Sequence, residues 1–308
     1  MDGDDEGLRR ALLPGVAGRQ RTICCHSATL SGDYAPNSLE AVQECVAAGV
    51  PRLEVDVRFA ADDGLVCFHD ASLDAQTTGA GRIADHTTLE LRALTYRSAG
   101  ESLALLEEVV DAIRGSSTML QVDLKLSRPI SPDRVKRLEQ VLAPVASQVV
   151  VGSQSPWNLR KFSRVPVAFD PTLFLNYTPG RRQAPYPRQR GIHGFWDDSP
   201  LARNPYTTPQ DYLEARLEEL RGLVPAAIEW MVDIGTVLRI ADLGIALGDE
   251  LARHGIELAA WTLQERDPVQ PTLERLWAAG VATVITDVPI AVAAALRAYS
   301  APVDVNPR

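Results

Sequence analysis

The sequence predicts a closed barrel of eight parallel strands that alternate with helices, the TIM (β/α)8 barrel. About eight short apolar runs alternate with helical patterns in one unbroken series, and no linker separates two halves. No glycine-rich phosphate loop follows the first strand, which counts against the dinucleotide-binding fold. The 308 residues are 45% hydrophobic, which is enough to bury the core of one domain of barrel size.

The first strand–helix step follows a short polar leader. The run RTICCH at 21–26 is β-branched and Cys-rich, and it predicts a short strand. A helix is expected at 38–48 because apolar residues recur there at helical spacing, with Asn37 as its cap and Gly49 as its stop. The strand expected at 51–57 then begins the second step.

A hairpin interrupts the alternation after the second strand. A turn at 62–64 leads into a second apolar run at 65–68, which ends in His69-Asp70. The alternation then resumes and continues through the rest of the barrel. We expect helices at 88–94, 102–113, 132–142, 156–162, 209–222, 236–254, 271–279 and 289–299, and strands at 119–126, 148–152, 165–169, 225–232, 256–263 and 281–286.

Residues 170–206 break this rhythm. They are rich in Pro and Arg and show no periodic pattern over roughly 35 residues, which is typical of a functional loop or lid. We therefore expect residues 21–308 to form a single domain that carries this insertion. An acidic leader at 1–20, with one helix turn at 8–13, precedes it.

Two carboxylates on the second strand are the clearest sign of function. Glu54 and Asp56 are two residues apart, so on a strand their side chains point to the same face. His69 ends the neighbouring run of the hairpin and offers an acid/base group beside them, and His26 ends the first strand. Because TIM barrels carry their catalytic residues where strands end, we expect these groups to meet at one mouth.

Later strand ends add a third carboxylate and a lysine. Asp123 and Lys125 lie near the end of the third strand, Trp261 ends the seventh, and Asp287 follows the eighth. Three carboxylates without clustered Cys or His predict a hard divalent cation, magnesium or calcium. Lys125 beside the cation suits a substrate with negative charge on oxygen, of which phosphate is the commonest. Taken singly, each of these residues is as readily explained as a solvated rim, capping or core residue.

Composition limits the partners and the location. Forty acids against 31 bases give a net charge of -9, which disfavours non-specific nucleic-acid binding. No apolar run reaches about 18 residues and the start is polar and acidic, so we expect a cytoplasmic protein without stable membrane insertion. The four cysteines match no zinc or haem spacing and are expected to be buried. The oligomeric state is not predicted.

Together, these motifs resemble those of the glycerophosphodiester phosphodiesterase family, whose fold is a TIM barrel of the PLC-like phosphodiesterase type. The resemblance runs from residue 22 to residue 298 and is tightest in the first hundred residues. The residues that carry it are His26, Asn37-Ser38, Glu54-Val55-Asp56, Asp63-Gly64, His69-Asp70, Thr77-Thr78-Gly79, Asp123-Leu124-Lys125, Trp261-Thr262 and Thr286-Asp287-Val288-Pro289.

The resemblance implies a phosphodiesterase of lipid metabolism that uses Mg²⁺ or Ca²⁺. Glu54, Asp56 and Asp123 would hold the cation, with His26 and His69 as general base and acid. A hydroxyl next to the phosphodiester would attack phosphorus, an alcohol would leave, and water would then open the cyclic phosphate. The substrate would be a small glycerophosphodiester-like molecule. The expected substrate contacts are Lys125, Trp261 and Ser27.

Two positions depart from the family pattern. Its His-Arg-Gly reads His26-Ser27-Ala28, so the phosphate-binding arginine is absent, and its Pro-Glu-Asn-Thr reads Ala35-Pro36-Asn37-Ser38, so the glutamate is absent too. Losing such an arginine could cost on the order of 2–4 kcal/mol. The Arg-rich segment 181–190 is a candidate replacement. Two alternatives stay open: a lyase or specialised-pathway enzyme of the same superfamily with another phosphate substrate, and a non-catalytic ligand-binding barrel.

Overall fold

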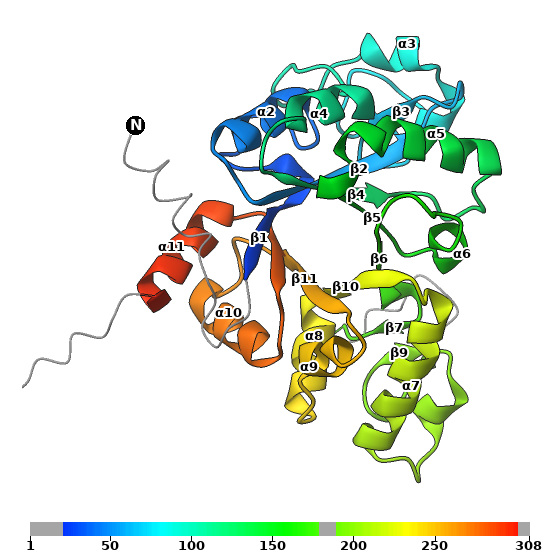
Figure 1. The fold of residues 1–308 in the computed structure, drawn as a ribbon, viewed down its shortest axis with the longest axis vertical. Coiled ribbons are helices and arrows are strands. Elements are labelled where there is room, and N and C mark those ends of the chain that lie inside the picture. The colour runs from blue at the N-terminus through cyan, green and yellow to red at the C-terminus, as the bar shows by residue number, and fades with distance from the viewer. Residues whose placement is uncertain (1–20, 179–188, 301–308) are drawn as a thin grey trace, which may run out of the picture.

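The computed structural model describes residues 21–178 and 189–300, and its centre is a closed parallel barrel (Figure 1). Eight strands pair in parallel around it, and β1 pairs with both β12 and β2, which closes the ring. This confirms the predicted fold class. In chain order the barrel strands are β1 (Thr22–Cys25), β2 (Arg52–Phe59), β4 (Met119–Leu124), β5 (Val149–Ser153), β6 (Val167–Phe169), β10 (Ala227–Asp233), β11 (Glu257–Leu263) and β12 (Thr283–Thr286).

Helices surround the barrel on the outside (Figure 1). The α-helices are α2 (Leu39–Ala47), α3 (Thr88–Arg92), α4 (Leu106–Ile113), α5 (Pro132–Leu142), α6 (Pro156–Leu159), α7 (Pro209–Leu223), α8 (Ile234–Asp242), α9 (Leu247–Ala252), α10 (Val269–Ala278) and α11 (Pro289–Ser300). The 3-10 turns are η2 (His26–Ala28), η3 (Ile83–Asp85), η4 (Ala143–Gln148), η5 (Pro171–Leu173) and η6 (Pro200–Arg203).

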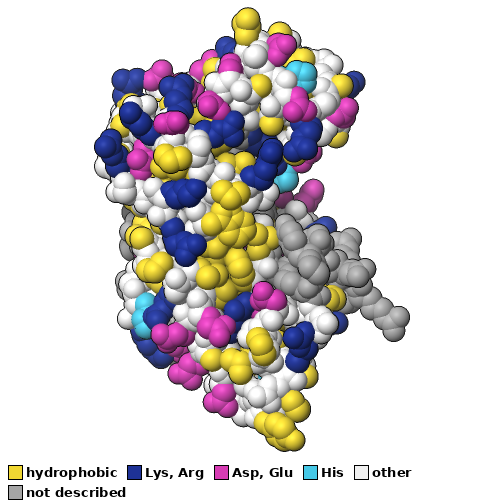
Figure 2. Space-filling view, turned by 90° about the vertical axis from the view of Figure 1, so that its right-hand side faces the viewer, with side chains coloured by type: hydrophobic (Ala, Val, Ile, Leu, Met, Phe, Trp, Pro, Cys, Tyr) yellow, Lys and Arg dark blue, Asp and Glu magenta, His cyan; other side chains and the backbone are white. Residues whose placement is uncertain are grey.

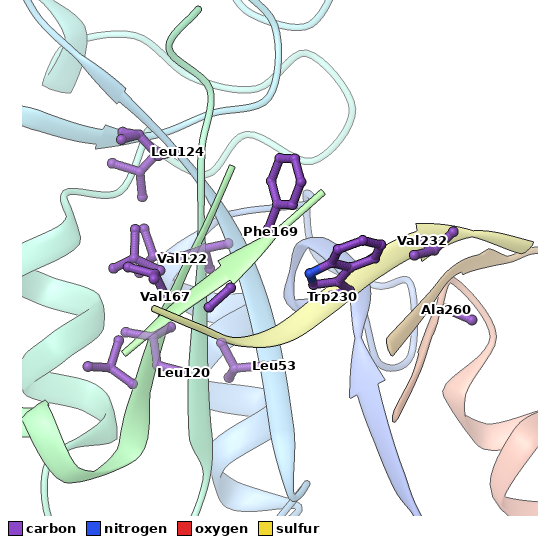
Figure 3. Close-up of a cluster of buried hydrophobic side chains, with 14 of the residues drawn as sticks. Leu53, Leu120, Val122, Leu124, Val167, Phe169, Trp230, Val232 and Ala260 are labelled. Atoms are coloured by element: carbon purple, nitrogen blue, oxygen red, sulfur yellow. The ribbon is translucent and has the colours of Figure 1, made fainter. Parts of the chain in front are cut away.

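Alternate residues of each barrel strand point outward and inward, as the period of two requires. The outward set packs with the helices in the main hydrophobic core, part of which Figure 3 shows on β2, β4, β6, β10 and β11. The inward set is a separate, smaller apolar cluster that includes Cys24, Met231 and Ile285. Glu54, Asp56 and Asp123 alternate with outward-facing residues such as Val55 and Val122, so the strand period turns the carboxylates inward.

A buried polar group fills the interior near the start of β2. Both terminal nitrogens of Arg52 donate to the Glu229 carboxylate at 2.7 and 2.6 Å, and one of them also donates to Gln121 at 2.7 Å. All three side chains are buried. The ion pair satisfies charges that would otherwise be costly to bury. Sequence analysis did not identify it.

Residues 60–105 leave the barrel and fold around a second, smaller core. Strand β3 (Leu65–Cys67) pairs antiparallel with β2, which confirms the hairpin. The core of this segment is built from Val66, Phe68, Leu73, Leu91 and others. Residues 60–105 belong to the lobe that carries α3. In Figure 2 this lobe lies at the top of the molecule and overhangs an indentation. Phe68 belongs to this second core and lies between β3 and His69, so the core fixes the loop that presents His69.

Three local predictions are wrong. The cap of α2 is Ser38, whose hydroxyl accepts a hydrogen bond from the Ala41 amide, and not Asn37. The helix expected at 102–113 begins only at Leu106, because the residues before it form isolated bridges with other segments. The helix expected at 236–254 is two helices, α8 and α9, since Gly244 adopts a φ of 84° between them and breaks the hydrogen-bond ladder.

The described part of the insertion at 170–206 is more regular than predicted. Strands β7 (Leu175–Asn176), β9 (Trp196–Asp197) and β8 (Gln189–Arg190) form a small antiparallel sheet. The buried Asp197 joins this sheet to α7, because its carboxylate accepts from the Tyr212 hydroxyl at 2.6 Å and pairs with Arg216 at 2.8 Å. Residues 179–188 lie outside the described residues, as does the leader 1–20 with its expected helix turn.

Gly248 in α9 packs directly against Gly280. A Cβ atom at Gly248 would lie 2.0 Å from the Gly280 carbonyl oxygen, which is backbone. We expect Gly248→Ala to lower the free energy of unfolding by about 1–3 kcal/mol, the range for overpacking. Gly222 in α7 is the control: no described atom lies within 4 Å of its Cβ position. Gly222→Ala should raise the free energy of unfolding by about 0.8–1 kcal/mol. Denaturant unfolding measures both, and equal shifts would contradict the packing argument.

Candidate active site

A cavity of about 220 Å³ opens where the barrel strands end. Of the eight predicted site residues, six line it, and the other two, Asp56 and Ser27, are buried directly behind them. The lining residues are His26, Glu54, His69, Gln121, Asp123, Lys125, Gln154, Asp170, Met231, Trp261, Thr262 and Ile285.

The three carboxylates of Glu54, Asp56 and Asp123 converge. Each offers an oxygen, and these atoms all lie within 4.8 Å of one another. The cause is the sheet register, in which Asp56 on β2 is the direct neighbour of Asp123 on β4. The Lys125 ammonium lies 3.1 Å from Asp56 Oδ1 and 2.6 Å from Asp123 Oδ2. Although burial opposes its charge, these carboxylates hold the pKa of Lys125 above its ordinary value.

The charge balance of this group fits a divalent cation. Three carboxylates and one ammonium leave two negative charges uncompensated when all are ionised. Burial and the Asp56 charge together raise the pKa of Glu54 to about 8. Without a cation, Glu54 therefore keeps its proton at neutral pH, and this proton compensates one of the two negative charges. Hard carboxylate oxygens are the ligands that Mg²⁺ and Ca²⁺ prefer. The donor set therefore fits the cation that the sequence predicts.

His26 lies in η2, immediately after β1. Its Nδ1 is 2.7 Å from Asp287 Oδ1, and its Nε2 faces Glu54 Oε2 at 3.9 Å. The other Asp287 oxygen accepts from Gln264 at 3.2 Å. Burial lowers the pKa of His26, but the hydrogen bond to Asp287 and the Glu54 charge outweigh burial and raise it to about 9. Asp287 thus orients the ring and leaves Nε2 on the cavity side.

His69, which lies after β3 of the hairpin, is also oriented by a neighbouring aspartate. Its Nδ1 lies 2.8 Å from Asp70 Oδ1, and the second Asp70 oxygen accepts from Gln76 at 2.9 Å. Arg58 fixes the backbone, because its Nε donates to the His69 carbonyl at 2.8 Å and its Nη1 to the Lys125 carbonyl at 3.1 Å. Two histidine–aspartate pairs therefore face one cavity, which is the arrangement needed for a base and an acid.

The loop after His26 holds the buried carboxylates from behind. The Ser27 amide donates to Glu54 Oε2 at 2.7 Å, and the Ser27 hydroxyl donates to Asp56 Oδ2 at 3.2 Å. Asn37 makes two bonds to Asp56: its Nδ2 donates to Oδ2, and its Oδ1 accepts from the Asp56 amide, both at 2.8 Å. The hydroxyl of Ser27 is directed at Asp56 and does not line the cavity, so its role as a substrate contact stays a prediction.

Asn37 is a site residue whose role the sequence analysis missed, and its loss should be measurable. Its φ of 65° is one that asparagine and glycine tolerate best. Asn37→Gly keeps this conformation but leaves the buried Asp56 amide unpaired, so we expect the free energy of unfolding to fall by about 1–3 kcal/mol. Denaturant titration checks this. An unchanged midpoint would show that Asp56 does not need this support.

Other cavity residues were missed although a signal existed. Asp170 directly follows β6, so the strand-end rule that selected Asp123 also applies to it. Gln154 follows β5 in the same way. In the Arg-rich segment, Arg181, Arg182 and Arg188 lie outside the described residues, and Arg190 donates to the Gly194 carbonyl at 3.2 Å. Among the described lining residues, Lys125, His26 and His69 are the groups that can carry positive charge.

Comparisons with known proteins agree with this geometry. Residues 29–164 match the model of the Glycerophosphoryl diester phosphodiesterase family. A glycerophosphodiester phosphodiesterase of Bacillus altitudinis is 24% identical over 52% of this chain and 74% of its own length. One from Caldanaerobacter subterraneus is also 24% identical, and the match spans 42% of this chain and only 56% of that relative.

Solved structures share the fold. A glycerophosphodiester phosphodiesterase from Parabacteroides distasonis superposes with a TM-score of 0.65 at 18% identity, over 92% of this chain and 99% of that one. An Oleispira antarctica phosphodiesterase in complex with the product sn-glycerol-3-phosphate superposes with a TM-score of 0.62 at 17% identity, over 90% of this chain and 96% of that one. The segment that matches the family model contains Glu54, Asp56, His69 and Asp123, and the solved structures share the barrel fold over most of this chain.

Proposed function

We propose that this protein is a metal-dependent phosphodiesterase that converts a small glycerophosphodiester-like substrate to an alcohol and a phosphomonoester. The observation that carries the proposal is the meeting of three carboxylates and two histidine–aspartate pairs around one cavity. The names of its relatives support the same activity. We also propose that residues 21–308 act as one domain.

Glu54, Asp56 and Asp123 would hold the divalent cation, Mg²⁺ or Ca²⁺. When bound, such a cation stabilises negative charge on phosphate oxygens. Lys125 supplies a second positive charge to the same oxygens, since its ammonium lines the cavity beside Asp123. In this proposal Lys125 and the cation together take the place of the arginine that position 27 lacks.

His26 and His69 divide the proton transfers. A bound cation would offset the Glu54 charge that helps to raise the pKa of His26, so that the ring can be neutral. Its Nε2 then takes the proton from a hydroxyl next to the phosphodiester as that oxygen bonds to phosphorus. His69 gives a proton to the departing oxygen as the second phosphorus–oxygen bond breaks, so the alcohol leaves neutral. When water opens the cyclic phosphate, the two histidines exchange roles. Asp287 and Asp70 keep each ring oriented throughout by their bonds to Nδ1.

The volume of the cavity favours a small polar substrate. A cavity of about 220 Å³ suits a headgroup better than a lipid with two acyl chains, and Trp261 forms part of its wall. On the face in Figure 2, acidic and basic side chains are interspersed. The lack of nucleic-acid binding stays a prediction from the net charge. In the part of the chain that the structure describes, no helix combines the length and apolar character needed to span a membrane. A cytoplasmic location stays a prediction from the sequence.

Phosphorus NMR of the reaction products tests this proposal. Incubation with glycerophosphodiesters and Mg²⁺ or Ca²⁺ should yield a phosphomonoester signal. A cyclic phosphate that accumulates without opening would favour the lyase alternative. An unchanged spectrum across the panel, with every cation, would favour the non-catalytic barrel and overturn the proposal.

A further inference from the structure

One carboxylate in the cavity takes no part in the proposed chemistry. Asp170 lines the cavity but is only 6% exposed, so its carboxylate is largely buried. It follows β6, which three strands separate from β1 in either direction around the barrel. Asp170 therefore lies across the mouth from His26.

Asp170 is outside the group of carboxylates that can share a cation. That group consists of Glu54, Asp56 and Asp123 among the described residues. Asp170 Oδ1 accepts from the Thr172 amide at 2.8 Å, and Oδ2 accepts from Gln154 Nε2 at 2.9 Å. Gln154 also lines the cavity. The pair is thus held in place by protein contacts before any substrate binds.

The chemistry of this pair matches a hydroxyl group. A carboxylate has about four acceptor positions and an amide nitrogen has two protons, so Asp170 can still accept a hydrogen bond and Gln154 can still donate one. A hydroxyl both donates and accepts, and it satisfies the two together. A phosphate oxygen would be repelled by Asp170, and an ammonium could not accept from Gln154.

We propose that Asp170 and Gln154 form a subsite that binds a hydroxyl of the alcohol that stays on the phosphate. This rests on the proposed function. The hydroxyl is distinct from the attacking one, which must lie near His26 on the other side of the cavity. For a glyceryl group, the subsite binds the terminal hydroxyl and thereby selects glycerol over alcohols that lack it.

Two chromogenic substrates that differ by one hydroxyl test the subsite. Glyceryl para-nitrophenyl phosphate carries the terminal hydroxyl, whereas hydroxypropyl para-nitrophenyl phosphate lacks only that group and keeps the attacking hydroxyl and the leaving group. The wild-type enzyme with Mg²⁺ or Ca²⁺ should prefer the glyceryl substrate in kcat/KM by on the order of 10²-fold or more, as sites built for a hydroxyl do. Asp170→Ala should lower kcat/KM for the glyceryl substrate by most of that factor and change the hydroxypropyl rate less than about threefold.

Two further variants make the result decisive. Gln154→Ala should reduce the same preference. This variant tests the subsite even if Asp170→Ala does not fold. Asp233→Asn, at the end of the neighbouring strand β10 and not among the cavity-lining residues, should leave the preference unchanged. Equal losses on both substrates in the Asp170 and Gln154 variants, or no loss on either, would overturn the subsite. Loss only on substrates whose leaving alcohol carries an ammonium would overturn it too. A wild-type enzyme that cleaves neither substrate, nor any glycerophosphodiester, would instead refute the proposed function.

Discussion

His69→Ala is expected to lower the turnover of a glycerophosphodiester by on the order of 10²–10⁴-fold, the usual contribution of a positioned acid or base. Among the described cavity residues, the remaining positively charged groups that could give a proton to the leaving oxygen are His26 and Lys125. His26 is held by Asp287 for the other transfer, and two carboxylates hold the Lys125 ammonium in its charged form. Steady-state kinetics with cation present should show the loss in kcat more than in KM.

The matched control is His254→Ala. This histidine follows α9, is exposed, and does not line the cavity, so its removal should leave kcat unchanged. His26→Ala should lower the turnover of a glycerophosphodiester by a factor similar to that of His69→Ala. A substrate whose leaving group needs no proton should recover much of the His69→Ala loss and little of the His26→Ala loss. Equal recovery in both variants would contradict the assignment of base and acid.

Asp56→Asn is expected to weaken divalent-cation binding by at least about 10–100-fold, which is the loss seen when even a supporting partner of a metal ligand is removed. The Asp56 carboxylate is fully buried and held by Asn37 and Ser27, so no other group can move into its place. Calorimetric titration of Mg²⁺ and Ca²⁺ measures the change. Asp233→Asn, another carboxylate at a strand end, is the control and should bind as the wild type does. Equal affinities in both variants would refute the assigned ligand set.

Cation affinity should also depend on pH. The pKa of Glu54 is raised to about 8 by burial and by Asp56, so below this pH the cation must displace a proton from that carboxyl. We expect the apparent affinity to rise with pH, by up to about tenfold per unit, and to level off above the pKa of Glu54. Titrations in buffers of different ionisation heat would detect the released proton. An affinity independent of pH between neutral and acidic conditions would show that Glu54 is already ionised.

The local sequence predicted most of the fold and the residues at the centre of the site. The alternation of strands and helices predicted the barrel, and the two-residue spacing of Glu54 and Asp56 predicted their common face. The contacts that the local sequence could not predict depend on how the strands are aligned with one another. Asp123 meets Asp56 because β2 and β4 pair in one particular register, and Arg52 meets Glu229 across the barrel interior. No local pattern encodes such contacts.

The errors have physical causes of the same kind. Asn37 and Ser38 are both good caps, and only the tertiary demand of Asp56 for a bidentate partner decides that Ser38 caps α2 while Asn37 turns inward. Gly244 lies within the single helix predicted at 236–254, and its positive φ separates α8 from α9. Asp170 opens a segment without periodicity, so its place after a predicted strand is the one local sign of its role.

Chelation and restoration of activity test the central claim most directly. The wild-type enzyme is assayed on a glycerophosphodiester before and after removal of divalent cations, and again after Mg²⁺ or Ca²⁺ is returned. We predict that phosphomonoester formation stops on chelation and recovers in the wild type, and that Asp56→Asn recovers little at the same cation concentration. Full activity of the wild type in chelator would contradict a site in which Glu54, Asp56 and Asp123 hold the cation beside His26 and His69.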